Sequence, residues 1–191
     1  IESLRFILKA RDLNDAVSQE SLKNCFGHQV GRTINNRNLK YDPFGDTILS
    51  HVMARTAAAA DARMAGCPMA VMSNSGSGNQ GIATTMPVVA FAEEIKATEE
   101  QMIRALILSN LTAIYIKQNL GRLSALCGCV VASTGSSCGI TYLMGGDYQN
   151  ICAAVKNQIA GATGMICDGC KPSCVLKLAS AVSSAFQSAM I

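Results

Sequence analysis

A run of 24 uncharged residues between Arg122 and Asp147 constrains the fold of this chain more than any other segment. Its length alone would allow a membrane-spanning helix. However, the run contains four serines and two threonines, and these hydroxyl groups make it too polar for the lipid phase. We therefore expect a helix that is buried at the centre of a helical domain and ends at the glycine pair 145–146.

The composition favours helices throughout. Hydrophobic residues make up 49% of the 191 residues and charged residues 15%, which excludes a disordered chain and suffices for one buried core. Aromatic residues make up only 5%, so the core must consist of small and aliphatic side chains, which suit closely packed helices. No stretch alternates hydrophobic and polar residues over the length of a strand. We predict a single all-α domain over residues 1–191, a compact assembly of several helices.

Charge and cysteine content exclude several classes of protein. The net charge of +3 is small and dispersed, so we expect no nucleic-acid partner. The nine cysteines are odd in number, and several lie in apolar helical segments, unlike the paired framework of a secreted domain. We therefore expect reduced thiols, a cytoplasmic protein and no membrane partner.

Local patterns predict where helices begin and end. Thr98 and Gln101 form a capping box, and Asp147 can cap the helix that follows the uncharged run. Asn14 can cap an earlier helix, and the Asp42–Pro43 pair is a favourable helix start. The other expected features are a short amphipathic helix over 2–10, a polar loop over 31–45, a helix end near Gly66, a helix over 82–95 containing Pro87, a helix from 147 to about 165, and a final helix after residue 174.

Five of the nine cysteines lie in two short segments. One residue separates Cys127 from Cys129, and Cys167, Cys170 and Cys174 fall within eight residues that include a glycine and a proline. Thiolates at such spacing bind zinc or iron–sulfur clusters, and the scarcity of histidine favours an all-cysteine site. The remaining four are expected to pack as small hydrophobic side chains: Cys25, Cys67, Cys138 and Cys152.

A second polar segment, residues 73–81, contains three glycines and precedes a predicted helix. Its backbone amides can turn toward an anion at the helix N-terminus. The segment lacks the lysine of a P-loop, and no strand precedes it as in a Rossmann fold. We expect it to bind a small carboxylate, with Ser73, Asn74, Ser75, Gly76, Ser77 and Asn79 as the candidate residues.

Four motifs occur in order along the chain: Met72-Ser-Asn-Ser-Gly-Ser-Gly-Asn-Gln-Gly, Leu126-Cys-Gly-Cys, Tyr142-Leu-Met-Gly-Gly-Asp and Gly164-Met-Ile-Cys-Asp-Gly-x-Lys-Pro-x-Cys. Together they resemble the L-cysteine desulfidase family, which is related to the alpha chain of iron–sulfur L-serine dehydratases. The resemblance covers essentially the whole chain. It implies an all-helical catalytic domain, like the serine dehydratase alpha domain, with a buried, oxygen-labile [4Fe–4S] cluster held by three cysteines. It also implies a carbon–sulfur lyase that converts L-cysteine to pyruvate, ammonia and sulfide.

The resemblance further implies which residues bind the cluster. Cys167 and Cys174, seven positions apart, match two cluster ligands of the desulfidases. The third ligand is Cys127 or Cys129, and the count back from the glycine pair favours Cys127. Cys170 matches no ligand of the family.

The resemblance does not identify which residues of this chain transfer protons. The Ser73–Asn74 pair resembles the Thr-Asn of the dehydratase substrate loop, whereas the proposed base of the family is a cysteine in an N-terminal portion that is missing here. His28 and His51 are weak candidates for proton transfer, and Lys171 is a candidate for binding a carboxylate. Because family members are much longer, we expect this chain to be a fragment that is inactive alone. Its first residue, which is not methionine, and its apolar last residues agree with this expectation.

Three functions therefore stay open. The seven-residue spacing favours L-cysteine desulfidase over L-serine dehydratase. A zinc-binding or redox-sensing module without enzymatic activity, built on Cys167, Cys170 and Cys174, is the alternative from another class. The expected partners are a small amino-acid substrate, a second copy of the chain in a homo-oligomer, and the missing N-terminal portion.

Overall fold

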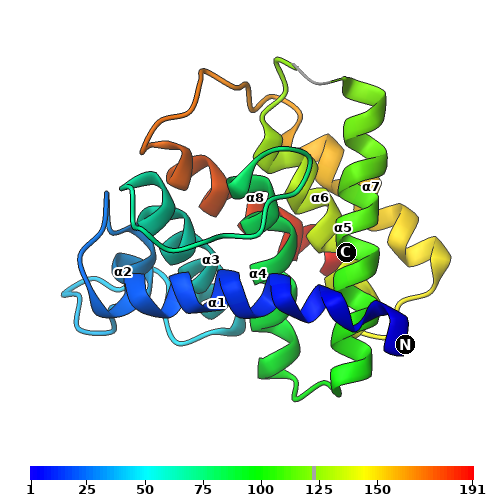
Figure 1. The fold of residues 1–191 in the computed structure, drawn as a ribbon, viewed down its shortest axis with the longest axis horizontal. Coiled ribbons are helices and arrows are strands. Elements are labelled where there is room, and N and C mark those ends of the chain that lie inside the picture. Colours follow the sequence, from blue (N-terminus) through cyan, green and yellow to red (C-terminus); the bar gives the residue numbers. More distant parts are fainter. Residues whose placement is uncertain (122–123) are drawn as a thin grey trace.

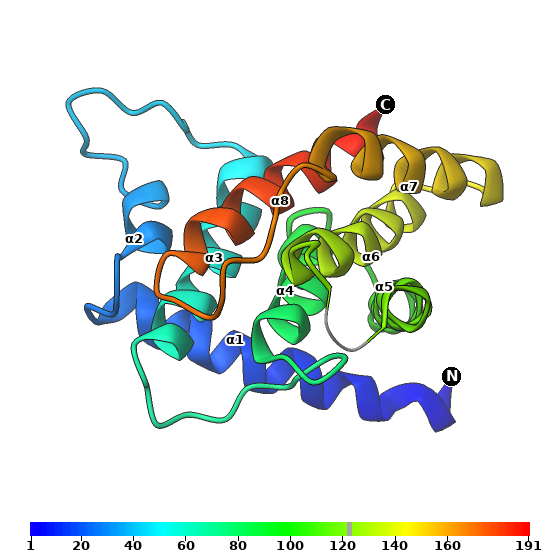
Figure 2. The same ribbon diagram turned by 90° about the horizontal axis from the view of Figure 1, so that it is seen from above.

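The uncharged run forms helix α6 (Gly128–Leu143), which lies at the centre of the molecule with α5 on one side and α8 on the other (Figures 1 and 2). The computed structural model describes residues 1–121 and 124–191, so residue 123, the first of the predicted run, lies outside the described residues. Every residue of α6 from Cys129 to Thr141 is buried. The prediction of a buried central helix is confirmed. No described helix is both long enough and apolar enough to cross a membrane.

All regular secondary structure in the described residues is helical, which confirms the all-α prediction. Apart from the helices there are two isolated antiparallel bridges, Asn74 with Ser77 and Leu126 with Ile166. In chain order the other helices are η1 (Glu2–Ile7), α1 (Leu8–Lys23), α2 (Val30–Ile34), α3 (Ile48–Met64), α4 (Gly78–Glu94), α5 (Glu99–Leu120), α7 (Tyr148–Ala162) and α8 (Cys174–Met190).

Small residues let α6 approach its neighbours closely. A Cβ atom on Gly135 would stand 2.3 Å from the backbone oxygen of Ser109 in α5, and one on Gly139 would stand 2.9 Å from that of Ala105. The serine and threonine side chains of α6 donate hydrogen bonds to backbone carbonyls of their own helix, for example Thr134 to Val130 over 2.8 Å. The hydroxyl groups are therefore satisfied without water, and a serine-rich helix can be buried.

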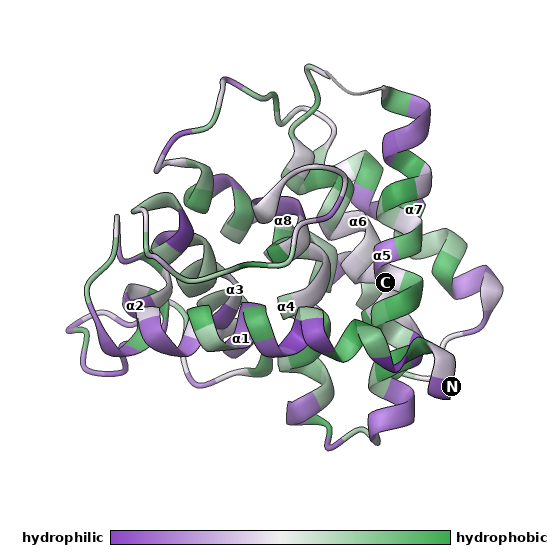
Figure 3. Cartoon of the chain, viewed as in Figure 1, coloured by the Kyte–Doolittle hydropathy of each residue, from purple (hydrophilic) through white to green (hydrophobic). Residues whose placement is uncertain are grey.

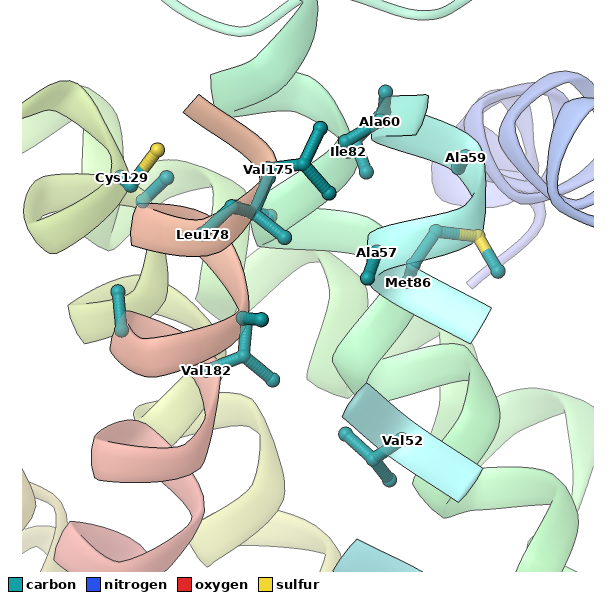
Figure 4. Close-up of a cluster of buried hydrophobic side chains, with 14 of the residues drawn as sticks. Val52, Ala57, Ala59, Ala60, Ile82, Met86, Cys129, Val175, Leu178 and Val182 are labelled. Atoms are coloured by element: carbon teal, nitrogen blue, oxygen red, sulfur yellow. The ribbon is translucent and has the colours of Figure 1, made fainter. Parts of the chain in front are cut away.

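Two clusters of hydrophobic side chains form the core. The larger one joins α3, α4, α6 and α8 and includes Val52, Ile82, Met86 and Leu178 (Figure 4). The smaller one joins the N-terminal residues to α4 and α5. Hydrophobic and hydrophilic residues alternate along α1, as expected for a helix with one buried face (Figure 3).

The prediction that Asn14 caps a helix is wrong. Asn14 lies inside α1, is fully buried, and bridges two other segments. Its Oδ1 accepts from the backbone N–H of Met72 (2.9 Å), and its Nδ2 donates to the backbone oxygen of Gly81 (3.3 Å). The hydrogen-bond partners of Asn14 are thus far away in the sequence, whereas the local sequence pattern predicted a helix cap.

Replacing Asn14 by leucine is expected to destabilise the protein by about 2 kcal/mol or more, because the backbone N–H of Met72 loses its acceptor and the buried oxygen of Gly81 keeps only donors of its own helix, such as Thr84 Oγ1. Urea unfolding would measure the change. Asn24→Ala, at the end of α1, removes only a contact with the exposed Glu20 and serves as the control. Equal effects of the two changes would contradict the bridging role.

The segment before α3 also differs from its prediction. Residues 31–34 of the expected loop belong to α2, whose Gly31 packs so closely on α3 that a Cβ atom would stand 2.4 Å from the backbone nitrogen of Ala58. Asp42 does not begin a helix, since its carboxylate accepts from the backbone N–H groups of the two residues after Pro43 in a turn. The helix instead begins at Ile48, where Thr47 and Ser50 form a capping box.

Other predicted boundaries are close to the observed ones. The capping boxes at Thr98 and at Asp147 are both present. Helix α3 ends at Met64, near the predicted Gly66, and α7 ends at residue 162 rather than 165. Helix α4 begins four residues earlier than predicted, because Ser77 is its N-cap and accepts from the backbone N–H of Gln80.

His51 ties α3 to two acidic residues. Its Nδ1 lies 2.7 Å from Glu94 Oε1 at the end of α4, and its Nε2 lies 2.7 Å from Asp46 Oδ1. The hydrogen bond with Glu94, followed by that with Asp46, raises the pKa of His51 above its ordinary value.

The stabilisation provided by His51 is expected to depend on pH. Because the folded-state pKa is raised, the contribution is fully present below the unfolded value of about 6.5 and is lost as pH rises through the folded-state pKa. Urea unfolding between about pH 6 and pH 8 would measure it, with His51→Gln as the control that removes this dependence. An unchanged pH dependence in His51→Gln would contradict the assignment.

Candidate functional site

An antiparallel bridge brings the two cysteine segments together. The backbone N–H of Cys127 donates to the oxygen of Met165 (3.0 Å), and that of Cys167 donates to the oxygen of Ala125 (2.8 Å). The chain thus enters α6 beside the turn that precedes α8. Residues far apart in the sequence are fixed side by side by backbone hydrogen bonds.

The five clustered cysteines line one cavity of about 150 Å³. It contains all four predicted metal ligands and also Cys170, which matches no ligand of the family. Cys127 and Cys129 are buried, Cys174 is half-buried, and Cys167 and Cys170 are exposed. The complete lining is Ser77, Asn79, Gln80, Cys127, Gly128, Cys129, Cys167, Gly169, Cys170 and Cys174.

Three helices begin at this cavity. The first residues of α4 and α6 lie beside it, at 78–79 and 128–129, and α8 begins at Cys174. The first turn of a helix has free N–H groups and carries a partial positive charge, so it attracts anions. Three such ends together favour thiolates, an anionic cluster and a carboxylate in the same place.

The thiols of Cys127 and Cys129 differ in acidity. A hydrogen bond from Cys129 holds the pKa of Cys127 well below its ordinary value, against the effect of burial, and the nearby Lys177 lowers it further. The same hydrogen bond and burial raise the pKa of Cys129. Cys127 also stands as the N-cap of α6, where a thiolate is favoured. Cys127 is therefore the more readily ionised thiol of the pair.

Lysines brace the turn that carries Cys167. Lys177 Nζ donates to the backbone oxygen of Ile166 (3.0 Å) and to the Asp168 carboxylate, and Lys171 Nζ donates to Asp168 Oδ2 (3.1 Å). The two hydrogen bonds to the Asp168 carboxylate lower its pKa to about 2, and the bond from Lys177 has the larger effect. Lys171 thus has a carboxylate partner within its own turn.

The five thiols of the cavity have the donor chemistry of an iron–sulfur cluster. In the described part of the chain, no three or more His, Cys, Asp or Glu side chains stand close enough together to bind one metal ion. A zinc site needs its sulfurs around one point, whereas the thiolates of a cluster bind separate irons and stand farther apart. Five thiols beside three helix N-termini suit an anionic cluster.

The four other cysteines lie outside the cavity lining. Cys138 is buried in α6, where burial raises the pKa of its thiol to about 11. Cys67 and Cys152 are half-buried, whereas Cys25 is exposed and accepts from Arg32 Nη1. Packing as a small hydrophobic side chain is confirmed for Cys138, and the prediction is wrong for Cys25.

The predicted substrate loop contains a tight turn. The backbone groups of Asn74 and Ser77 form two reciprocal hydrogen bonds of 3.0 and 3.1 Å. Both residues between them have positive φ, +51° at Ser75 and +82° at Gly76, as in a type I′ turn. The turn directs Ser77 and Asn79 toward the cysteines, and both line their cavity.

The rest of the loop faces elsewhere. Asn74 Nδ2 donates to Asn110 Oδ1 of α5 (2.9 Å), so its amide fastens the turn to the protein. Ser75 and Gly76 line a separate open cavity of about 590 Å³ beside Lys117. Ser73 is not part of the lining of the cysteine cavity. The structure thus brings two of the six predicted loop residues to the cysteines.

Neither histidine lies at the cysteine cavity. His28 is exposed in the turn before α2, and His51 pairs with Asp46 and Glu94 as described above. Their candidacy for proton transfer stays a prediction without a geometric link to the cysteines.

The chain is similar to known proteins over its whole length. The family described as Serine dehydratase alpha chain matches residues 1–191. The chain belongs to the serine dehydratase alpha chain family. The UPF0597 proteins of Phocaeicola vulgatus and Bacteroides thetaiotaomicron are each 58% identical over 191 residues, and that of Shewanella halifaxensis is 51% identical. These matches cover the whole of this chain but 44% of each relative. No solved structure matches the chain.

Two residues of this serine dehydratase alpha chain domain were missed by the sequence analysis. Gln80 lines the cysteine cavity, although it lies within the first quoted motif. Arg63, in the last turn of α3, donates to Asn79 Oδ1 (3.0 Å) and lies against Gly78. No carboxylate of the described residues pairs with Arg63, so its positive charge adds to that of the α4 N-terminus. No sequence pattern connects Arg63 to the loop.

Proposed function

We propose that this chain forms the cluster-binding part of an iron–sulfur lyase that converts L-cysteine to pyruvate, ammonia and sulfide. The observation that carries the proposal is the cavity where five cysteines meet the N-termini of α4, α6 and α8. Membership of the serine dehydratase alpha chain family supports a lyase. The resemblance to the desulfidases, with seven positions between Cys167 and Cys174, supports L-cysteine as the substrate.

In this proposal Cys127, Cys167 and Cys174 hold a [4Fe–4S] cluster. The low pKa of Cys127 favours it over Cys129 as the third ligand. When bound, the cluster supplies a Lewis acid for the departing sulfur. Lys177 and Asp168 keep the Cys167 turn in place against the start of α6.

The start of α4 is proposed to bind the carboxylate of the substrate. Ser77 and Asn79, at the start of α4, line the cavity, and the nearby charge of Arg63 strengthens the attraction of this helix N-terminus for an anion. A fixed carboxylate orients the α-proton toward a base. The resemblance places this base outside the 191 residues, and we retain that as part of the proposal.

The second candidate function is L-serine dehydratase, which the family description favours. Pyruvate release by the intact protein from L-cysteine and from L-serine, measured without oxygen, separates the two. We expect kcat/KM for L-cysteine to exceed that for L-serine by about tenfold or more. A preference for L-serine would contradict desulfidase activity while leaving a lyase of this family in place.

A further inference from the structure

Gln80 has an unusual environment in the first turn of α4. Gln80 is only 8% exposed, its side chain lines the cysteine cavity, and its Oε1 is buried with no hydrogen-bond partner among the described residues. The amide lies against Gly128, where a Cβ atom would stand 2.9–3.1 Å from Nε2, Cδ and Cγ. Gln80 thus packs on Gly128, the residue that separates the candidate ligands Cys127 and Cys129 in the sequence.

Buried amide oxygens almost always accept a hydrogen bond. We therefore expect Gln80 Oε1 to accept a hydrogen bond from a donor that has yet to be identified. The nearest polar side chain of the loop does not provide it, because Asn79 Nδ2 points to Met64 Sδ (3.3 Å). Among the lining cysteines, Cys129 donates to Cys127 and Cys170 donates to Met64 Sδ, and the three proposed ligands lose their protons when they ionise. A bound ligand with N–H groups would supply the donor.

The position of Gln80 defines which ligand group fits. An α-amino acid carries its ammonium and carboxylate groups on the same carbon, so their binding sites must be adjacent. Ser77, Asn79 and Gln80 all line the cavity from one helical turn, and the free N–H groups of that turn suit the carboxylate. The Gln80 oxygen is then the acceptor next to it.

We propose that Gln80 accepts a hydrogen bond from the α-ammonium group of the substrate and selects α-amino acids over carboxylic acids without that group. This inference rests on the proposed function, because it takes an amino acid as the substrate. It adds a specificity-determining residue to the cavity. The free N–H groups of the first turn of α4 would bind the carboxylate of the substrate, and the side chain of Gln80 would bind its ammonium group.

The test compares L-alanine with propionate, which differ only in the α-ammonium group and carry no leaving group. Calorimetry on the intact protein, without oxygen, gives the ratio of the two Kd values for wild type and for Gln80→Met. We expect wild type to prefer L-alanine and Gln80→Met to lose about tenfold or more of that preference, since hydrogen bonds to charged groups are strong.

Two further variants serve as controls for Gln80→Met. Gln80→Glu retains an acceptor and is expected to keep the preference for L-alanine. Gln158→Met makes the same change at a buried glutamine that hydrogen-bonds Ser133 and Ala181, away from the cavity lining, and should leave the ratio unchanged even if it lowers stability. Because a ratio is measured, a general loss of stability in Gln80→Met does not imitate the expected result.

An unchanged ratio in folded Gln80→Met, or an equal change in Gln158→Met, would overturn the inference. Wild-type protein that binds L-alanine no better than propionate would overturn it as well. Sulfide release from L-cysteine by wild type is measured in parallel. Release combined with an unchanged ratio leaves the proposed function in place and rejects only the role of Gln80.

Discussion

The substitutions Cys167→Ser and Cys174→Ser are each expected to abolish iron–sulfur absorbance. Each should also lower the rate of sulfide elimination from L-cysteine by more than about 100-fold. Changes to groups that merely support metal ligands already cost 10–100-fold, and loss of a ligand should exceed this range. Cys167 lies on the turn braced by Lys177, and Cys174 is the first residue of α8, so each is held at the cavity by backbone structure.

Cys170→Ser is the matched control for these variants. Cys170 lies in the same turn and lines the same cavity, and its Sγ approaches Met64 Sδ (3.9 Å). Cluster absorbance and pyruvate release should be retained. Equal losses in Cys167→Ser and Cys170→Ser would contradict the assignment, because all three cysteines of the turn would then bind the metal.

The same assay separates the two cysteines at the start of α6. Cys127→Ser should lose the cluster, because Cys127 is the N-cap of α6 and the more acidic thiol. Cys129→Ser should retain it, because the serine hydroxyl can still donate a hydrogen bond to the sulfur of Cys127. The reverse pattern would make Cys129 the third ligand.

Gly81→Ala is expected to destabilise the protein by about 3 kcal/mol or more, at the upper end of the range for overpacked interiors. A Cβ atom on Gly81 would stand 1.8 Å from the backbone oxygen of Met72 and 2.8 Å from Ser73 Cα. These are backbone atoms and cannot rotate away as a side chain would. The substitution must therefore push the polar loop off α4, which should also lower activity.

The control for Gly81→Ala is Gly164→Ala. Gly164 has no atom within 4 Å of the added Cβ and no positive φ, so its replacement should change stability by less than about 0.5 kcal/mol. Urea unfolding of both variants measures the difference. A destabilisation of Gly81→Ala below that of a typical surface change would show that the loop does not pack on α4 as described.

Features that depend on neighbouring residues were predictable. The serine-rich helix α6 satisfies its hydroxyl groups on its own backbone, so its burial follows from its own sequence. The capping boxes at Thr98 and Asp147 likewise involve residues three positions apart. Cysteine spacing identified the residues that meet at the cavity, because each of the two segments is short.

Features that depend on distant contacts were not predictable. Asn14 has the side chain of a cap, but its partners lie at positions 72 and 81. Half of the polar loop faces α5 or another cavity because the type I′ turn reverses the chain at Ser75. Tertiary structure alone reveals these roles.

The iron and acid-labile sulfide content of the intact protein after anaerobic reconstitution tests the central claim most directly. The account predicts about four irons and four sulfides per chain, as in a [4Fe–4S] cluster bound by cysteines. Bound zinc without acid-labile sulfide would contradict it and would favour the module built on Cys167, Cys170 and Cys174 instead.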